Sequence, residues 1–256
     1  MLKKRIIPTL LYKGLGLVKG SKFNSWRRVG PVLPAIKVYN AREVDELIFL
    51  DIEATNNNSE IDYQTIEEFS KFCFVPLTIG GGINNLNQVK KLFEIGADKI
   101  SVNSSSYDNP KLIESVANEF GSQSVVVSID AKKIDGKWFC FSNSGIKNRN
   151  IDPIQWSKTL ENFGAGEILI NSIEKDGTMD GYELDLISQI TSNVDIPVIA
   201  SGGAGKFEDL YSAIKITGAS AVAAASIFHF TEITPNQVKE FLEDKGIPIR
   251  KRFLEF

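Results

Sequence analysis

The chain has a single histidine and only two cysteines among its 256 residues. A Ser-His-Asp or Cys-His catalytic site, or a zinc site built on histidine, would have to use His229. That residue stands between two phenylalanines in "SIFHFTE", without a partner one helical turn away, so we expect it to have a structural role. Cys73 and Cys140 lack metal-ligand spacing and both occur in strand-like stretches, which predicts buried, reduced thiols. We therefore expect no metal and no cofactor.

The chain also lacks an excess of positive charge and any long apolar run. Its 29 Lys and Arg residues against 32 Asp and Glu residues give a net charge of −3, which argues against nucleic acid or an anionic membrane as a partner. No apolar run is long enough to cross a bilayer, and Met1 does not begin a signal peptide. With 43% hydrophobic residues the composition is that of a soluble globular protein, and we expect it in the cytoplasm.

Short apolar runs alternate with amphipathic segments along the whole chain. The runs are "RIIPTLL", "ELIFLD", "VPLTI", "KISVN", "SVVVSID", "EILINS", "IPVIA" and "SAVAAA". Nearly all lack polar alternation, as is typical of parallel strands buried on both faces. Polar residues beside a proline at 108–110, 152–153 and 234–235 predict helix starts, and a glycine closes each helix. Eight strand–helix units predict an α/β fold, a (β/α)₈ TIM barrel forming one domain over residues 1–256.

The barrel is predicted to be internally duplicated. Residues 5–11 align with 124–130, 46–56 with 167–177, 75–83 with 196–204, and 95–106 with 217–228. The matching glycines and strand-end serines favour duplication over the general likeness of any two βαβ units. We expect two half-barrels, roughly 1–120 and 121–256, with two similar half-sites facing each other across the barrel mouth.

Glycine-rich turns follow the third and seventh predicted strands, at residues 80–82 and 201–205. Glycine lets several backbone N–H groups turn toward an oxyanion, and ligand groups gather at the C-terminal ends of barrel strands. Residues 103–105 and 225–226 add amide and hydroxyl donors after the neighbouring strands, and Asp176-Gly177 would line the same mouth unless it is a plain turn. The pattern predicts two phosphate sites, and so a long substrate with a phosphate at each end.

Several motifs together resemble the cyclase subunit of imidazole glycerol phosphate synthase. They include "IGGGI", "GADKISVN", "GSQSVVVSIDAK", "GAGEILINSI", "DGTMDGY", "IPVIASGGAGK" and "AASIFHF", and the likeness runs from Met1 to about Arg250. The resemblance implies a barrel bound as a heterodimer to a glutaminase subunit, whose ammonia passes through the barrel. At the mouth, ammonia would react with a bisphosphate, phosphoribulosyl-formimino aminoimidazole carboxamide ribonucleotide. The implied products are imidazole glycerol phosphate, for histidine biosynthesis, and an aminoimidazole carboxamide ribotide.

The resemblance also implies roles for individual residues at the mouth. Asp130, at the end of the fifth strand, matches one of the two catalytic aspartates of the family. The positions that match phosphate-site residues are Gly82, Asn103 and Ser104 for one phosphate and Asp176, Gly177, Gly203 and Ser226 for the other.

At the opposite end of the barrel, four charged residues match the ammonia gate of the family: Arg5, Glu46, Lys99 and Glu167. Each begins a predicted strand, so the four can form a ring at the N-terminal face, although strand-start charges often just face water. The glutaminase is expected at this face, and Asp98 can face it too.

The chain departs from the family at the end of the first strand, where the other catalytic aspartate belongs. Here the residue is Leu11, which can neither donate nor accept a proton. Losing one general acid or base typically costs about 10²–10⁴ in rate. The first hypothesis is a cyclase that is slowed. The alternative is an ammonia-channelling subunit of a specialised glutamine amidotransferase complex that acts on another acceptor, such as a sugar, with or without turnover of its own. A sister isomerase family uses a carboxylate at the same strand end, so Leu11 counts against that activity as well.

Overall fold

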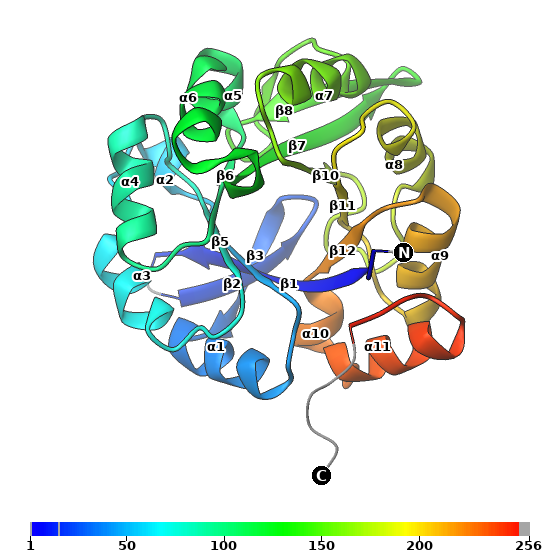
Figure 1. The fold of residues 1–256 in the computed structure, drawn as a ribbon. Coiled ribbons are helices and arrows are strands. Elements are labelled where there is room, and N and C mark those ends of the chain that lie inside the picture. The colour runs from blue at the N-terminus through cyan, green and yellow to red at the C-terminus, as the bar shows by residue number, and fades with distance from the viewer. Residues whose placement is uncertain (1, 15, 251–256) are drawn as a thin grey trace.

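Eight parallel strands close into a barrel in this computed structural model, which describes residues 2–14 and 16–250 (Figure 1). Met1 and the last residues of the predicted domain 1–256 lie outside the described residues. The barrel strands are β1 (Arg5–Lys13), β4 (Leu47–Asp51), β5 (Leu77–Gly80), β6 (Lys99–Val102), β7 (Val125–Ile134), β10 (Glu167–Ser172), β11 (Val198–Ser201) and β12 (Ala221–Ala224). The barrel closes because β1 pairs with β12 on one side and with β4 on the other. The predicted (β/α)₈ barrel is confirmed.

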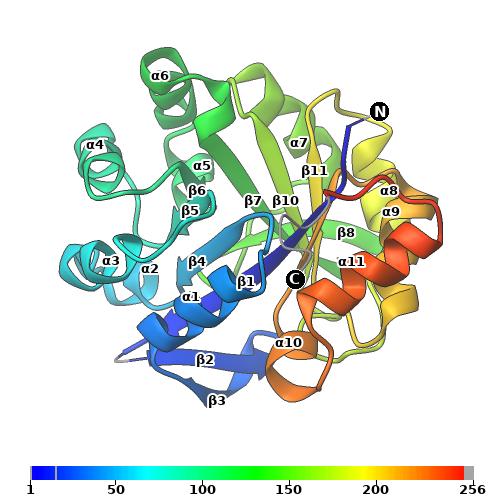
Figure 2. The same ribbon diagram turned by 60° about the horizontal axis from the view of Figure 1, so that its bottom comes forward.

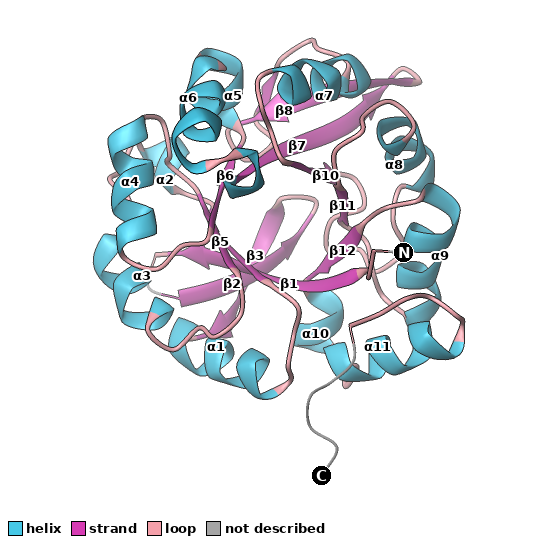
Figure 3. Cartoon of the chain, viewed as in Figure 1, coloured by secondary structure: helices cyan, strands magenta, loops and turns pink. Residues whose placement is uncertain are grey.

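Helices form a ring outside the strands (Figure 3). The longer ones are α1 (Val32–Ala41), α3 (Tyr63–Ser70), α4 (Leu86–Glu94), α6 (Lys111–Phe120), α7 (Pro153–Asn162), α8 (Leu184–Thr191), α9 (Phe207–Thr217) and α11 (Pro235–Asp244). Short turns of helix are α2 (Ala54–Asn57), α5 (Ser104–Asp108), α10 (Ser226–Phe230) and the 3₁₀ turn η1 (Ser122–Ser124).

The predicted helix starts are confirmed, with one difference in how they are capped. Asp152 caps α7 by accepting from the backbone N–H of Ile154 at 2.7 Å, and Thr234 forms a capping box at α11. Before α6 no side chain caps the helix, and Asp108 pairs instead with Arg149 at 2.6 Å. Asp108 is therefore held by an ion pair with a residue outside the helix and does not cap α6.

Two antiparallel hairpins extend barrel strands beyond the mouth. One joins β1 to β2 (Gly16–Ser21) and β3 (Asn24–Gly30); the other joins β7 to β8 (Lys137–Ser142) and β9 (Lys147–Asn148). The first hairpin lies beside α10 at one end of the barrel (Figure 2), where Arg27 sits over the ring of Phe230 at 4.5 Å. A hairpin thus follows the first strand of each predicted half-barrel, while the division into halves stays a prediction.

The core has two parts. Between the sheet and the helices lies the larger cluster, and inside the barrel lies a smaller one of Ile7, Ile48, Val126, Leu169, Ile199, Ala221 and Ala223. The strands are therefore apolar on both faces, which explains the unbroken runs in the sequence.

The two cysteines are free, but only one lies in a strand. Cys140 is buried in β8, as predicted. Cys73 is half-buried in the turn after α3, so the prediction of a strand at "KFCFVP" is wrong for it. Its N–H donates to the carbonyl of Ser70 in a turn that ends the helix, and β5 begins only at Leu77. In the part of the chain that the structure describes, no helix has the length and apolarity needed to cross a membrane.

Candidate functional site

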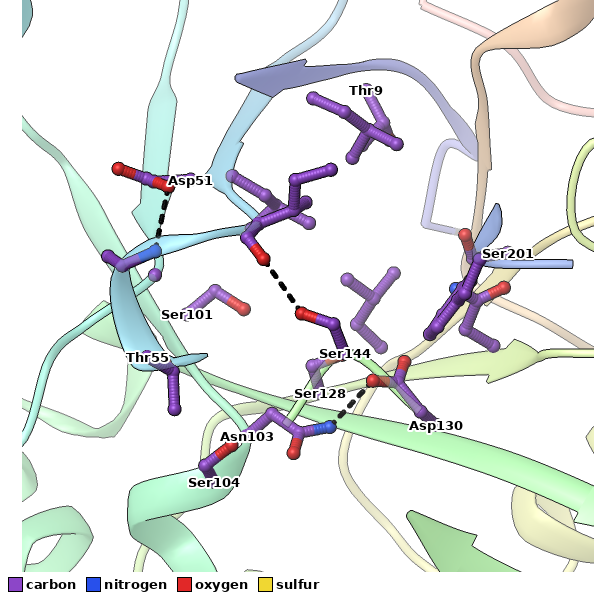
Figure 4. Close-up of a pocket in the computed structure, with 18 of the residues that line it drawn as sticks. Thr9, Asp51, Thr55, Ser101, Asn103, Ser104, Ser128, Asp130, Ser144 and Ser201 are labelled. Atoms are coloured by element: carbon purple, nitrogen blue, oxygen red, sulfur yellow. Dashed lines mark hydrogen bonds between the residues drawn. The ribbon is translucent and has the colours of Figure 1, made fainter. Parts of the chain in front are cut away.

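A cavity of about 360 Å³ opens at the C-terminal ends of the barrel strands (Figure 4). The structure brings together there the catalytic and phosphate-site candidates: Asp130, Gly82, Asn103, Ser104, Asp176, Gly177, Gly203 and Ser226. Of the predicted glycine turns, Gly80 and Gly205 do not line the cavity. Since ligands of this fold bind at that end of the strands, the cavity is the candidate active site.

The two glycine turns have backbone conformations that only glycine adopts easily. Gly81 has φ +106°, and a Cβ there would come within 2.2 Å of the carbonyl oxygen of Asp51. Gly203 has φ +116°, and its Cβ would come within 2.1 Å of the carbonyl oxygen of Gly181. Successive residues in such turns can point backbone N–H groups into one concavity, which is the usual cradle for a phosphate.

Several buried oxygens around the cavity lack a hydrogen-bond partner within the protein. They are Thr9 Oγ1, Asn103 Oδ1, Ser105 Oγ, Asn171 Oδ1 and Ser226 Oγ, and all five residues line the cavity. Buried polar atoms are nearly always paired. Their concentration here indicates a site built around a polar ligand.

Asp130 is buried in β7 with 9% of its surface exposed. Burial raises the pKa of this carboxyl to about 7, and the nearby charge of Asp176 adds to the rise. The side-chain amide of Asn103 donates to Asp130 Oδ2 at 2.9 Å (Figure 4). A carboxyl group with a pKa near neutrality can act both as a general acid and as a general base.

A buried ion pair closes one side of the mouth. Lys19 of β2, 2% exposed, places Nζ 2.8 Å from both carboxylate oxygens of Asp176. The backbone N–H of Lys22 also donates to the carbonyl of Asp176 at 2.7 Å, so the first hairpin is tied across the mouth to the loop after β10. Phe23 and Trp26 of this hairpin line the cavity. Sequence reasoning missed both aromatic residues, because nothing in their spacing shows that the hairpin folds back over the barrel.

Leu11 lies in β1 and lines the cavity with an apolar side chain. Its register partner in β4 is Leu50, which also lines the cavity. The next residue of β4, Asp51, is half-buried and uses Oδ1 to accept from the N–H groups of Glu53 and Ala54 at 2.9 and 3.0 Å. Asp51 thus holds the start of α2, and this wall of the mouth is apolar at the end of β1.

The four gate candidates form a closed ring of ion pairs at the other end of the barrel. Arg5 lies 2.7 Å from Glu46 and 3.0 Å from Glu167, and Lys99 lies 3.0 Å from Glu46 and 2.9 Å from Glu167. Their side chains are only 10–21% exposed, so the view that they simply face water is wrong. Asp98 is exposed beside them, and one of its oxygens accepts from the N–H of Leu77 at 2.8 Å.

His229 lies in α10 and does not line the cavity. Its ring contacts the rings of Tyr39 and Phe230, with centroids 6.5 and 6.3 Å away. Burial, together with the charge of Lys19, lowers the pKa of His229 to about 4, so the imidazole is neutral at physiological pH. Within residues 2–14 and 16–250, no group of three or more His, Cys, Asp or Glu side chains is placed to hold a metal ion.

Residues 5–234 match the family described as "Histidine biosynthesis protein". Three similar proteins are each named "Imidazole glycerol phosphate synthase subunit HisF". The protein from Hydrogenobaculum sp. is 45% identical over 251 residues, that from Chlorobium phaeobacteroides 43% over 250, and that from Chlorobium limicola 42% over 250. Each alignment covers 98% of this chain and 100% of the relative.

Proposed function

We propose that this chain, which belongs to the HisF family of imidazole glycerol phosphate synthase subunits, is a lyase-cyclase of histidine biosynthesis supplied with ammonia by a glutaminase subunit. Its substrate is the bisphosphate phosphoribulosyl-formimino aminoimidazole carboxamide ribonucleotide. The products are imidazole glycerol phosphate and the aminoimidazole carboxamide ribotide. The observation that carries the proposal is a single cavity that joins two glycine turns and a buried carboxyl group with a pKa of about 7.

The two ends of the substrate would occupy the two sides of the mouth. One phosphate would be held by Gly82, Asn103 and Ser104, and the other by Gly177, Gly203 and Ser226, with Asp176 beside it. Backbone N–H groups, rather than arginines, would do most of the holding, because Lys19 is the one Lys or Arg among the described residues that line the cavity.

Asp130 would carry the proton transfers. Ammonia adds through its nitrogen lone pair and must lose protons before the imidazole ring closes, while the departing nucleotide fragment must gain one. The ionised carboxylate can accept the first proton and the protonated form can return it, and a pKa of about 7 populates both forms. On the opposite side Leu11 offers no such group, so we expect a slow reaction whose proton transfers all take place at one carboxyl.

Ammonia would enter through the ring of ion pairs, from a glutaminase docked as a heterodimer at the N-terminal face in the cytoplasm. Directly inside the barrel lies the apolar cluster that includes Ile7, Ile48 and Leu169. Apolar walls admit neutral ammonia and exclude the ammonium ion, because a charge is costly to transfer from water. Asp98 would contact the partner at this face.

The decisive experiment combines the purified chain with a glutaminase subunit, glutamine and the bisphosphate, and measures imidazole glycerol phosphate. A parallel reaction replaces the glutaminase and glutamine with an ammonium salt. Product in both reactions supports the proposal. Substrate binding without product in either reaction would contradict it, and would favour the alternative of a channelling subunit for another acceptor.

Restoring the missing carboxylate should raise the cyclase rate. We expect Leu11→Asp to increase kcat with ammonium salts by about 10² or more, because a second positioned acid or base contributes that much. Asparagine has the same shape as aspartate but no titratable proton, so Leu11→Asn should give no such rise in kcat. A folded Leu11→Asp protein with unchanged kcat would show that the absent carboxylate does not limit the reaction.

Removing one member of the ring of ion pairs should impair the transfer of ammonia from the glutaminase subunit to the barrel. In Lys99→Met the carboxylates of Glu46 and Glu167 keep Arg5 as their one ion-pair partner among the described residues. We expect the glutamine-dependent rate to fall about tenfold, equivalent to ~1.4 kcal/mol in the transfer step, while the ammonium-dependent rate changes little. The measurement is the ratio of the two rates. Lys90→Met, on the surface of α4, is the control, and an unchanged ratio in Lys99→Met would argue against a gate.

A further inference from the structure

Two side-chain amides flank Asp130, one from each neighbouring strand. Asn103 follows β6, and its Nδ2 donates to Asp130 at 2.9 Å. Asn171 belongs to β10 and is the direct register partner of Asp130. Because β6 and β10 pair with β7 on opposite sides, the carboxyl lies between the two amides.

The equivalent place in the other predicted half-barrel is different. There the register partner of Leu11 is Leu50, whereas the register partner of Asp130 is Asn171. All four residues line the same cavity. The mouth therefore pairs carboxyl with amide on one side and leucine with leucine on the other.

The amide of Asn171 is held on its far side by the glycine turn after β11. Its Oδ1 is buried without a hydrogen-bond partner, and a Cβ on Gly202 would come within 2.3 Å of it. Gly202 has φ +86°, so a larger residue is excluded there by backbone conformation as well. This close packing fixes the amide plane, so that its donor side is available to the neighbouring carboxyl.

We propose that Asn171 is a positioning residue that orients the Asp130 carboxyl and stabilises its ionised form. The proposal rests on the proposed function, in which Asp130 transfers protons. An N–H donor bound to a carboxylate favours the charged form, whereas burial favours the neutral one. In agreement, the hydrogen bond from Asn171 opposes the rise in the pKa of Asp130 that burial and Asp176 cause.

The charge state of the other titratable groups near Asp130 decides how each one affects the pKa of this carboxyl. Asp176, in the loop after β10, raises the pKa of Asp130, and Lys19 of β2 partly balances that charge through its ion pair. Tyr107 of α5 and Cys140 of β8 are close enough to interact with Asp130, but burial raises the pKa of both, so both are neutral near pH 7. The hydrogen-bond donors beside the carboxyl are the side-chain amides of Asn103 and Asn171.

The test is the titration of Asp130 itself, followed by carbon NMR of protein labelled at the aspartate carboxyl groups. The signal is assigned by its loss in Asp130→Asn. We expect a midpoint near pH 7 in the unmodified protein and an upward shift of about one pH unit in Asn171→Leu, which keeps the branching of the side chain but removes the donor. Asn171→Thr, which restores a hydroxyl donor, should return the midpoint most of the way. Asn162→Leu, at the exposed end of α7, should leave it unchanged.

Asn171→Ala removes the same donor without new bulk and should give the same shift, so it replaces the leucine variant if that one does not fold. An unchanged midpoint in either folded variant would overturn the proposal. Because the titration needs no substrate, its outcome is independent of whether the cyclase reaction occurs. Where turnover is observed, Asn171→Leu should move the acidic limb of the pH–rate profile upward, with the KM for the bisphosphate within about twofold.

Discussion

Replacing Asp130 with asparagine should lower kcat by a factor of about 10²–10⁴ and at the same time make the protein more stable at pH 8. Turnover falls by about that factor because the proposed general acid and base is lost. The gain in stability follows from the raised pKa of Asp130, about 7 in the folded protein against ~3.9 in the unfolded chain. Below pH 4 the carboxyl is protonated in both the folded and the unfolded state, so it does not lower the free energy of unfolding. From pH 4 to 7 only the unfolded state ionises, so stability is lost as the pH rises, and above pH 7 the cost stays constant at about 2–4 kcal/mol.

Urea unfolding of both proteins at pH 4 and pH 8 measures this effect. Asp130→Asn should raise the free energy of unfolding at pH 8 and leave it nearly unchanged at pH 4. Asp244→Asn, at an exposed position of α11, should change neither value much. Equal differences at both pH values would mean that the carboxyl does not titrate in the predicted range. A buried carboxyl that destabilises its own fold is what the proposed catalytic role of Asp130 predicts, because such a group serves chemistry rather than packing.

Replacing Lys239 with methionine should lower the free energy of unfolding by about 3–5 kcal/mol, because it leaves a buried charge uncompensated. Lys239 of α11 is 4% exposed and lies 2.8 Å from Asp45, which is 3% exposed. The other oxygen of Asp45 accepts from the N–H of Ile6 at 2.8 Å. The pair therefore fastens the last long helix to the first barrel strand, and its loss weakens the closure of the barrel.

The double variant Lys239→Met, Asp45→Asn should recover part of that loss, since no unpaired charge remains. Urea midpoints give the comparison, and Lys215→Met, on the exposed face of α9, provides the baseline for a surface lysine. A loss below ~1 kcal/mol in Lys239→Met would mean that Asp45 finds water or protonates readily, and that this pair contributes little to stability.

Local sequence signals predicted the fold because each acts over a few residues. Apolar runs marked the eight strands, and residues such as Asp152 and Thr234 marked helix starts that the structure confirms. The same local logic failed at Cys73, where an apolar pattern resembled a strand but the backbone continues the turn that ends α3. It also missed both hairpins beyond the mouth, because a strand that continues past the barrel has the same pattern as one that ends there.

The candidate site was predictable in its members but not in its chemistry. Glycine turns and strand-end serines are recognisable from the sequence, and the barrel fold alone gathers them at one end. What the side chains do there depends on partners distant in the chain. Asp176 pairs with Lys19 across 157 residues, and Arg5 with Glu167 across 162.

By itself the sequence determined the barrel, the glycine turns and the leucine at position 11, since backbone preference, hydrophobic pattern and residue identity are properties of the chain. Only the tertiary structure decided that Arg5, Glu46, Lys99 and Glu167 form one closed ring, that Asp130 is buried enough for its pKa to reach about 7, and that Asn171 stands beside it. Burial and charge pairing depend on distances in space, and those exist only once the eight strands have closed.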